Sequence, residues 1–379
     1  WGDNSIYKKG DFGILIGLHL HVHAHVHVTC SRGSRQWVTS FPTERLDLEG
    51  HGGQVFREVI TTYLGRESPV SRPLVVQGLA FALPHGPVPV DAYGFEAGRA
   101  TALPGGSHTA CHDTIADTLL SICEEAGLEV RAEPSTIFAR AIPAVDLIAA
   151  RGQGGIIPDA SVVVSLPAAL TTPSDRPSPS RLRLPERRLL WDVKTIHGDT
   201  SWYQTARARD QQCGAVEGRA QAVHQGYIAH AWRLDRRYHA GLDPGLVEQI
   251  ILDHGRVRGA AFGAYGEWSW DVEWLIEAAA SAAARRLWRR MGGRSESHAR
   301  GILLASYRRR MGLTVVREMA SHVIRQSQLA GLSREQLGRV TRERQLQRDG
   351  TERAVEGAMR AVEIAQELVP AFHQGGHGF

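Results

Sequence analysis

Cysteine and lysine are both scarce in this chain of 379 residues. Its four cysteines are widely spaced and form no C-x-x-C pair: Cys30, Cys111, Cys123 and Cys213. This spacing argues against a zinc ribbon and a dense disulfide framework, so a reducing intracellular compartment is the default expectation. Because lysine is rare, the 44 cationic side chains are mostly arginine, which suits bidentate phosphate contacts. The net charge of +4 and a pI near 9 permit a nucleic-acid partner.

The sequence also lacks a convincing membrane segment. The apolar stretch 12–28 carries a histidine at every second position from His19 to His27. These five imidazoles make a poor membrane span, and the stretch lacks the cleavage site of a secretory signal, so no membrane partner is expected. The histidines could bind Zn²⁺ or Ni²⁺ adventitiously, but a non-functional leader segment of biased composition is the simpler interpretation. Because the chain begins with Trp1, we expect a fragment or a translated open frame.

The composition is otherwise that of a globular protein, with 42% hydrophobic and 22% charged residues. Residues 1–104 give weak signals because prolines interrupt short apolar runs, and we expect poor order in much of this region. Residues 105–270 alternate helical and extended patterns and are predicted to form the main domain. Residues 271–379 are predicted to be a basic helical region. The Pro-, Ser- and Arg-rich stretch 166–188 predicts a surface loop.

Hydrophobic spacing between residues 112 and 266 predicts helix, strand, strand, strand, helix and strand in that order. The predicted elements are a helix at 112–127, strands at 128–133, 156–164 and 189–196, a helix at 214–237 and a strand at 257–266. Further helices are expected at 278–291, 297–328, 333–347 and 351–368. The sequence therefore predicts an α/β protein with helices on its C-terminal side.

Asp192 and Lys194 lie two residues apart in the predicted strand 189–196. Side chains at positions i and i+2 leave a strand on the same face, so a carboxylate and an ammonium project together from an apolar strand. Charges are rarely placed there without a use. The pair Pro158-Asp159 leads into the preceding predicted strand. Taken alone, Asp192 and Lys194 would be interpreted as a structural ion pair and Pro158-Asp159 as an ordinary turn. Their positions on successive predicted strands favour a common site instead.

Two carboxylates and an ammonium meet the chemical needs of phosphodiester hydrolysis. Carboxylate oxygens bind Mg²⁺ or Mn²⁺ and leave room for water and a phosphate oxygen. The cation lowers the pKa of a bound water, and a nearby ammonium can orient that water or neutralise developing negative charge. Asp159 and Asp192 are therefore the predicted metal ligands, and Lys194 is the predicted water-positioning catalytic group.

Pro-Asp followed by Asp-x-Lys on the next strand resembles the signature of the PD-(D/E)xK nuclease superfamily. The stretch 112–134, together with Pro158-Asp159 and Trp191-Asp192-Val193-Lys194, resembles the restriction-like endonuclease domain of non-LTR retroelement proteins linked to reverse transcriptases. This resemblance covers roughly residues 105–325. It implies a restriction-endonuclease-like αβββαβ core with a mixed sheet, and a metal-dependent endonuclease that nicks DNA, with RNA left open. An intracellular, nuclear location is expected.

The resemblance also implies further site residues. In that family the helix after Asp-x-Lys usually supplies a lysine or tyrosine to the active site. The resemblance implies that Tyr227 takes that place here, with Arg219 as the second candidate. Arg219 is otherwise a nucleic-acid-binding candidate. The first helix often supplies another acid, and Asp117 is the predicted third metal ligand, with Asp113 and Glu124 as alternatives.

A cluster of arginines at helical spacing follows in the C-terminal region. Phosphate contact is expected for three of its members, although a solvated helix face would explain them as well: Arg285, Arg289 and Arg290. Arg308 to Arg310 form a second cluster of the same kind.

The chain departs from the family in two respects. The zinc knuckle is missing, since His108, Cys111 and His112 cluster without paired cysteines. No reverse-transcriptase motif is present, which suggests a detached C-terminal piece. A non-catalytic nucleic-acid-binding module, or an inactive relic on the same fold, is therefore the alternative function. The sequence does not predict the oligomeric state.

Overall fold

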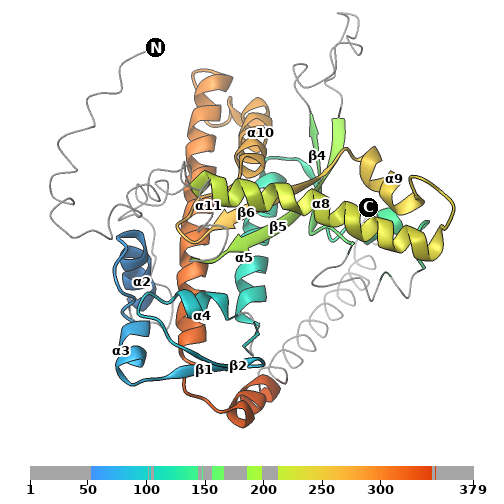
Figure 1. Ribbon diagram of the computed structural model, residues 1–379. Helices are drawn as coiled ribbons and strands as arrows, with labels where there is room; N and C mark the ends of the chain where they lie inside the picture. Colours follow the sequence, from blue (N-terminus) through green and yellow to red (C-terminus); the bar gives the residue numbers. More distant parts are fainter. Residues whose placement is uncertain are drawn as a thin grey trace, which may run out of the picture.

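The computed structural model describes residues 53–100, 102–103, 106–143, 147, 156–165, 186–198, 212–343 and 346 (Figure 1). Three sequence predictions lie outside these residues wholly or in large part: the histidine-rich segment 19–27, most of the loop 166–188 and the helix at 351–368.

A four-stranded mixed sheet forms the centre of the protein. Its strands, in spatial order, are β3 (Glu129–Ala132), β4 (Ala160–Ser165), β5 (Glu186–Ile196) and β6 (Val257–Gly263). The pairs β3–β4 and β4–β5 are antiparallel, whereas β5 and β6 are parallel. Helix α5 (Ser107–Glu125) precedes β3, and α8 (Gln212–Tyr238) lies between β5 and β6 in the chain. The predicted α/β class and the predicted order of elements from 112 to 266 are confirmed.

Strand β5 alternates between two hydrophobic cores, as a strand covered on both faces should. Leu189, Trp191 and Val193 pack on one side in a core shared with α5, whereas Leu190 packs on the other side against α8. The alternation therefore directs Asp192 and Lys194 toward the face that α8 covers. Figure 1 shows α8 crossing this face of the sheet.

The helices after β6 belong to the same core as the sheet. α10 (Trp270–Leu287) and α11 (Glu296–Ser327) pack with α5 on the face opposite α8. Their alanines, valines and methionines belong to the same hydrophobic cluster as residues of β4, β5 and β6. The predicted domain boundary at 270 thus separates two segments that share one hydrophobic core. A shorter helix that was not predicted, α9 (Leu246–Asp253), packs beside α8.

Residues 53–100 are folded, whereas poor order was predicted for much of the first hundred residues. They form α2 (Gln54–Tyr63), α3 (Ser71–Val76), the hairpin of β1 (Ala80–Leu83) and β2 (Gly86–Pro89), and α4 (Phe95–Arg99). Val55 and Val59 of α2 pack against Val316 and Ile324 of α11. Each of these elements has ten residues or fewer, so the apolar pattern that it gives the sequence is brief. A separate 3₁₀ turn, η3 (Ser135–Phe138), follows β3.

Candidate functional site

Strand β5 continues past the end of its neighbour β4. Its pairing with β4 ends at Trp191, opposite Ala160, whereas its pairing with β6 continues to Ile196. From Asp192 onward, the backbone groups of β5 that face β4 must therefore find other partners. Asp-x-Lys begins at this point, and Asp159 immediately precedes β4.

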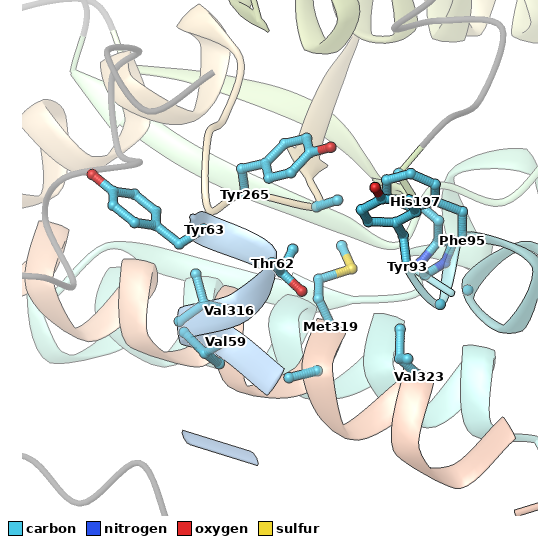
Figure 2. Close-up of a pocket in the computed structure, with 15 residues that line it drawn as sticks. Val59, Thr62, Tyr63, Tyr93, Phe95, His197, Tyr265, Val316, Met319 and Val323 are labelled. Atoms are coloured by element: carbon cyan, nitrogen blue, oxygen red, sulfur yellow. The ribbon is translucent and has the colours of Figure 1, made fainter. Parts of the chain in front are cut away.

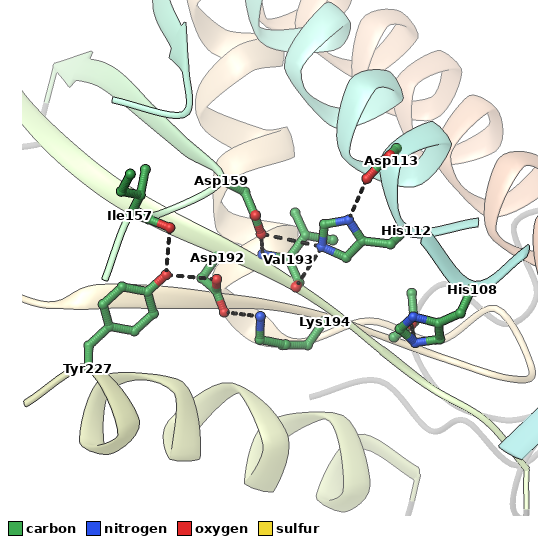
Figure 3. A network of polar contacts seen from close by, with 10 residues as sticks. His108, His112, Asp113, Ile157, Asp159, Asp192, Val193, Lys194 and Tyr227 are labelled. Atoms are coloured by element: carbon green, nitrogen blue, oxygen red, sulfur yellow. Dashed lines mark hydrogen bonds and ion pairs between the residues drawn. The ribbon is translucent and has the colours of Figure 1, made fainter. Parts of the chain in front are cut away.

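Side chains satisfy the exposed backbone of Val193, the middle residue of Asp-x-Lys. Its N–H donates to Asp159 Oδ2 at 2.6 Å, and its carbonyl oxygen lies 3.1 Å from His112 Nε2. The same imidazole nitrogen lies 3.4 Å from Asp159 Oδ2, and His112 Nδ1 lies 3.0 Å from Asp113 Oδ1. Figure 3 shows this chain of contacts running from α5 to the strand. Asp159 is thus held at the edge of the sheet by β5 and α5 together.

Asp192 and Lys194 meet on the α8 side of the strand. Asp192 Oδ2 lies 2.6 Å from Lys194 Nζ, and Asp192 Oδ1 accepts a hydrogen bond of 2.9 Å from the Tyr227 hydroxyl (Figure 3). The same hydroxyl lies 3.2 Å from the carbonyl oxygen of Ile157. The Asp192 side chain is only 5% exposed, whereas Lys194 is 32% and Asp159 27% exposed. The site therefore has one buried carboxylate and two solvent-accessible charged groups.

The two carboxyl groups differ in proton affinity because their surroundings differ. Burial raises the pKa of Asp192 above its usual range; Lys194 opposes this shift, and the charge of Asp159 adds to it. Burial also acts to raise the pKa of Asp159, but the hydrogen bond and charge of His112 outweigh it, and the pKa is lowered. Burial likewise raises the pKa of the Tyr227 hydroxyl, which stays protonated and donates to Asp192.

His112 is the residue of this network to which the sequence assigned no catalytic role. Burial acts to lower its pKa, but hydrogen bonds to Asp159 and Asp113 raise that pKa to about 9. The only sequence signal was its place in the cluster with His108 and Cys111. Its contact with Val193 spans 81 residues of chain and follows from the packing of α5 on the sheet.

The predicted third metal ligand does not join the group. Asp117 is exposed on α5 and, among the described residues, makes no hydrogen bond or ion pair with Asp159 or Asp192. Of the two alternatives, Asp113 contacts His112, and Glu124 lies near the far end of the helix. Helix α5 therefore brings a histidine, rather than an acid, to the carboxylate of Asp159.

The predicted nucleic-acid-binding residues lie at different distances from this group. Arg219 is half-buried two turns before Tyr227 on α8. The arginines at the end of α10 are exposed: Arg285, Arg289 and Arg290. Their neighbour Arg286 bonds the carbonyl of Glu125 at the C-terminal end of α5. His112 lies near the other end of that helix, about 20 Å away along its axis, so this patch is remote from the carboxylates.

The second arginine cluster is engaged in helix packing. Arg308 forms ion pairs with Glu273 and Glu277 of α10, and Arg310 forms one with Glu125 of α5. Two of its three arginines thus link α11 to its neighbours.

An apolar pocket lies at the carboxyl ends of β5 and β6. Figure 2 shows Tyr93, Phe95 and His197 gathered at one side, with Met319 of α11 among the other lining residues. His197 is 7% exposed, and its ring lies 4.6 Å from that of His322 and 5.5 Å from that of His108. These three histidines, which we call the histidine cluster, lie beyond the end of β5, past Lys194.

The residues present fit a divalent cation, with carboxylate oxygens as donors. Asp192 Oδ2 is buried, and among the described residues the ammonium of Lys194 is the polar group that lies close to it. Asp159 uses Oδ2 for Val193 and His112, which leaves Oδ1 for another partner. Two such oxygens with water ligands would suit Mg²⁺, which keeps several waters in proteins. Among the described residues no three His, Cys, Asp or Glu side chains converge as a metal-binding group, so water would have to complete any coordination.

No family model, no curated protein and no solved structure matches this chain. In the part of the chain that the structure describes, no helix has the length and apolar character needed to cross a bilayer.

Proposed function

We propose that the protein is a metal-dependent endonuclease that nicks DNA, built on a restriction-endonuclease-like core and derived from a non-LTR retroelement. The observation that carries this proposal is the grouping of Asp192, Lys194 and Asp159 where β5 runs beyond β4. The order of helix, three strands, helix and strand supports it, as does the change from antiparallel to parallel pairing at β5.

Each residue has a defined role in this proposal. Asp159 and Asp192 bind Mg²⁺ or Mn²⁺, which when bound would lower the pKa of a water ligand and stabilise negative charge on the phosphate. Lys194 orients the attacking water and neutralises the charge that develops in the transition state. Tyr227 keeps the buried carboxylate of Asp192 in place by donating to Oδ1.

The choice of lysine at position 194 supports a chemical role. Lys194 is the only lysine after Lys9, in a chain with 44 lysine and arginine residues in total. An arginine would serve a structural ion pair at least as well, because its guanidinium binds a carboxylate in bidentate fashion. An ammonium, unlike a guanidinium, can also take part in proton transfer.

The exposed fractions support access by a phosphodiester. Lys194 and Asp159 are about one-third and one-quarter exposed, so a phosphate can approach the site from their side. Asp192, by contrast, is screened from water by Tyr227 and the strand. An enzyme of this kind needs both conditions, because a cation held partly out of water acts more strongly on its ligands.

Plasmid nicking by the purified chain tests the proposal. Wild-type protein should convert supercoiled to open-circular DNA with Mg²⁺ or Mn²⁺. EDTA should stop this conversion. Asp159→Asn, Asp192→Asn and Lys194→Met should each reduce the rate at least about 100-fold. Asparagine keeps the size of the carboxylates and an oxygen acceptor, so loss of activity would report loss of charge rather than of packing. Asp253→Asn on α9, an exposed acid away from the site, is the control and should change nothing.

Full activity in EDTA, or in all three site variants, would reject the proposal. Asp117→Asn examines the sequence prediction separately. An unchanged rate would remove Asp117 from the ligands, and a loss comparable to that of Asp159→Asn would restore it.

A non-catalytic nucleic-acid-binding module on the same fold is the second candidate. Two contacts favour it: Lys194 already neutralises Asp192, and Asp159 already completes the hydrogen bonding of β5. Salt-sensitive DNA binding, without cleavage in any divalent cation, would support this alternative over the enzyme.

A further inference from the structure

Two contacts reach one oxygen of Asp159: a hydrogen bond from the sheet and an ion-pair contact from His112 on α5. Val193 N–H donates to Oδ2 at 2.6 Å, and His112 Nε2 approaches the same oxygen at 3.4 Å. With Oδ2 occupied in this way, the carboxylate is turned so that Oδ1 is its remaining donor atom. A single bond from Val193 would leave the carboxylate plane free to rotate about that contact.

The imidazole of His112 is itself fixed at both nitrogens. Nε2 lies 3.1 Å from the carbonyl oxygen of Val193, and Nδ1 lies 3.0 Å from Asp113 Oδ1. The ring therefore takes its orientation from its own helix and from β5, independently of Asp159. Groups that hydrogen-bond to a metal ligand without touching the metal fix the orientation of that ligand. Loss of such a group lowers the affinity for the metal by about 10–100-fold.

We propose that His112 is a positioning residue that fixes the carboxylate of Asp159 for divalent-cation binding; this rests on the proposed function. The first helix, from which the sequence predicted an acidic ligand, contributes instead the histidine that orients one. His112 acts through Asp159 and does not touch the cation or the phosphate.

A purely structural role for His112 makes a different prediction. If the histidine only tied α5 to the free carbonyl of Val193, its replacement would lower the thermal stability and leave cation affinity unchanged. The two roles separate when stability and cation binding are measured on the same variants.

Asparagine and glutamine replacements isolate the critical nitrogen. The side-chain amide of His112→Gln places an N–H near the position of Nε2 and keeps a donor for Asp159. In His112→Asn the amide lies near the position of Nδ1, so it reaches toward Asp113 and falls short of Asp159. Both variants stay polar and similar in size. His108→Gln, one turn earlier on α5, is the matched control because His108 contacts Thr195 and not Asp159.

Titration calorimetry of the full chain with Mn²⁺, without nucleic acid, is the primary measurement. His112→Asn should weaken Mn²⁺ binding by about 10–100-fold, whereas His112→Gln should stay within about 3-fold of wild type. His108→Gln should bind as wild type does. In the nicking assay, the Mg²⁺ concentration for half-maximal rate should rise for His112→Asn, while the rate at saturating Mg²⁺ stays within about 3-fold.

The possible outcomes are distinguishable. If wild type binds no Mn²⁺, the proposed function fails, and the inference about His112 fails with it. If wild type binds Mn²⁺ and His112→Asn binds it equally well, the positioning role is wrong although the function stands. Equal weakening in the Asn and Gln variants would also overturn it. If both variants unfold, Asp113→Asn replaces them, because it weakens the contact that fixes His112 Nδ1 at an exposed position. Asp113→Asn must then weaken Mn²⁺ binding measurably. Unchanged Mn²⁺ binding would overturn the inference.

Discussion

Tyr227 supports the site through one oxygen atom. Its hydroxyl donates to Oδ1 of Asp192, a buried carboxylate that also forms an ion pair with Lys194. Removing a hydrogen-bond partner from a buried charged group costs more than the bond itself contributes, because the group keeps its desolvation penalty.

Tyr227→Phe should therefore lower the free energy of unfolding by about 1–3 kcal/mol at pH 7. Urea denaturation followed by circular dichroism measures this change. Tyr307→Phe is the control, since Tyr307 is also buried but makes no hydrogen bond through its hydroxyl to another described residue, and its loss should be smaller. Equal losses in the two variants would show that the hydroxyl of Tyr227 does not stabilise Asp192.

Residues on one strand were the part of the site that sequence could predict. The alternation of a strand is local, so the common face of Asp192 and Lys194 followed from their spacing and is confirmed by their ion pair. The nearness of Asp159 required only that the two predicted strands be neighbours. His112 reaches Val193 from a helix packed on the sheet, and no local pattern encodes that contact. The roles of Asp159, Asp192 and Lys194 in catalysis stay predictions.

Helix α8 carries Tyr227, and its approach to the sheet depends on Gly259. A Cβ atom built at Gly259 would lie 2.4 Å from Cα of Ala220, far inside any permitted contact. Gly259 is also the residue of β6 that pairs with Asp192. Displacing α8 at this point would therefore separate Tyr227 from the carboxylate that it holds.

Gly259→Ala should destabilise the fold by about 1–3 kcal/mol or more, because the overlap is with backbone that cannot move alone. It should also reduce nicking more than Tyr227→Phe does. Gly226→Ala on the same helix is the matched control: it is exposed, no atom lies within 4 Å of its added Cβ, and it should gain about 0.5–1 kcal/mol. Thermal melts and urea titrations of both variants check this, and a neutral Gly259→Ala would contradict the packing argument.

Element length decided which parts of the fold the sequence could predict. Long helices such as α8 and α11 repeat their apolar spacing over many turns, and the core strands are flanked by clear breaks. The eight residues of α9 and the short elements between 53 and 100 repeat their apolar spacing over fewer than three turns, which is too short a stretch to identify the element from sequence. Their position is set by tertiary packing, chiefly against α8 and α11.

The histidine cluster joins several parts of the molecule. His108 comes from α5, His197 from the end of β5 and His322 from α11, and the ring of His322 accepts from Ser107 while donating to the carbonyl of Gly98 in α4. Arg325 also bonds Ser107 and so adds a positive charge beside the cluster. Placing imidazoles and a guanidinium together in the interior disfavours adding another proton.

Protonation of these buried histidines should therefore weaken the fold, whereas the buried carboxyl of Glu58, whose pKa is raised to about 7, acts in the opposite direction. Burial lowers the pKa of His322 to about 4 and that of His197 well below its usual value. Between pH 6.5 and about 4 these histidines bind protons in the unfolded chain but not in the folded chain, so the stability that depends on their neutral form is complete above this window and is lost as pH falls through it. His322 alone should account for a loss on the order of 3 kcal/mol.

Urea denaturation at several pH values between 7.5 and 4 measures this slope. His322→Gln keeps a hydrogen-bonding side chain but cannot titrate, so its stability should fall less steeply with acid than that of wild type, even if it is lower at pH 7.5. His298→Gln, at an exposed position near the start of α11, should retain the wild-type slope. If His322→Gln and wild type lose stability in parallel, the buried histidine is not the group through which protons destabilise the junction of α4, α5 and α11.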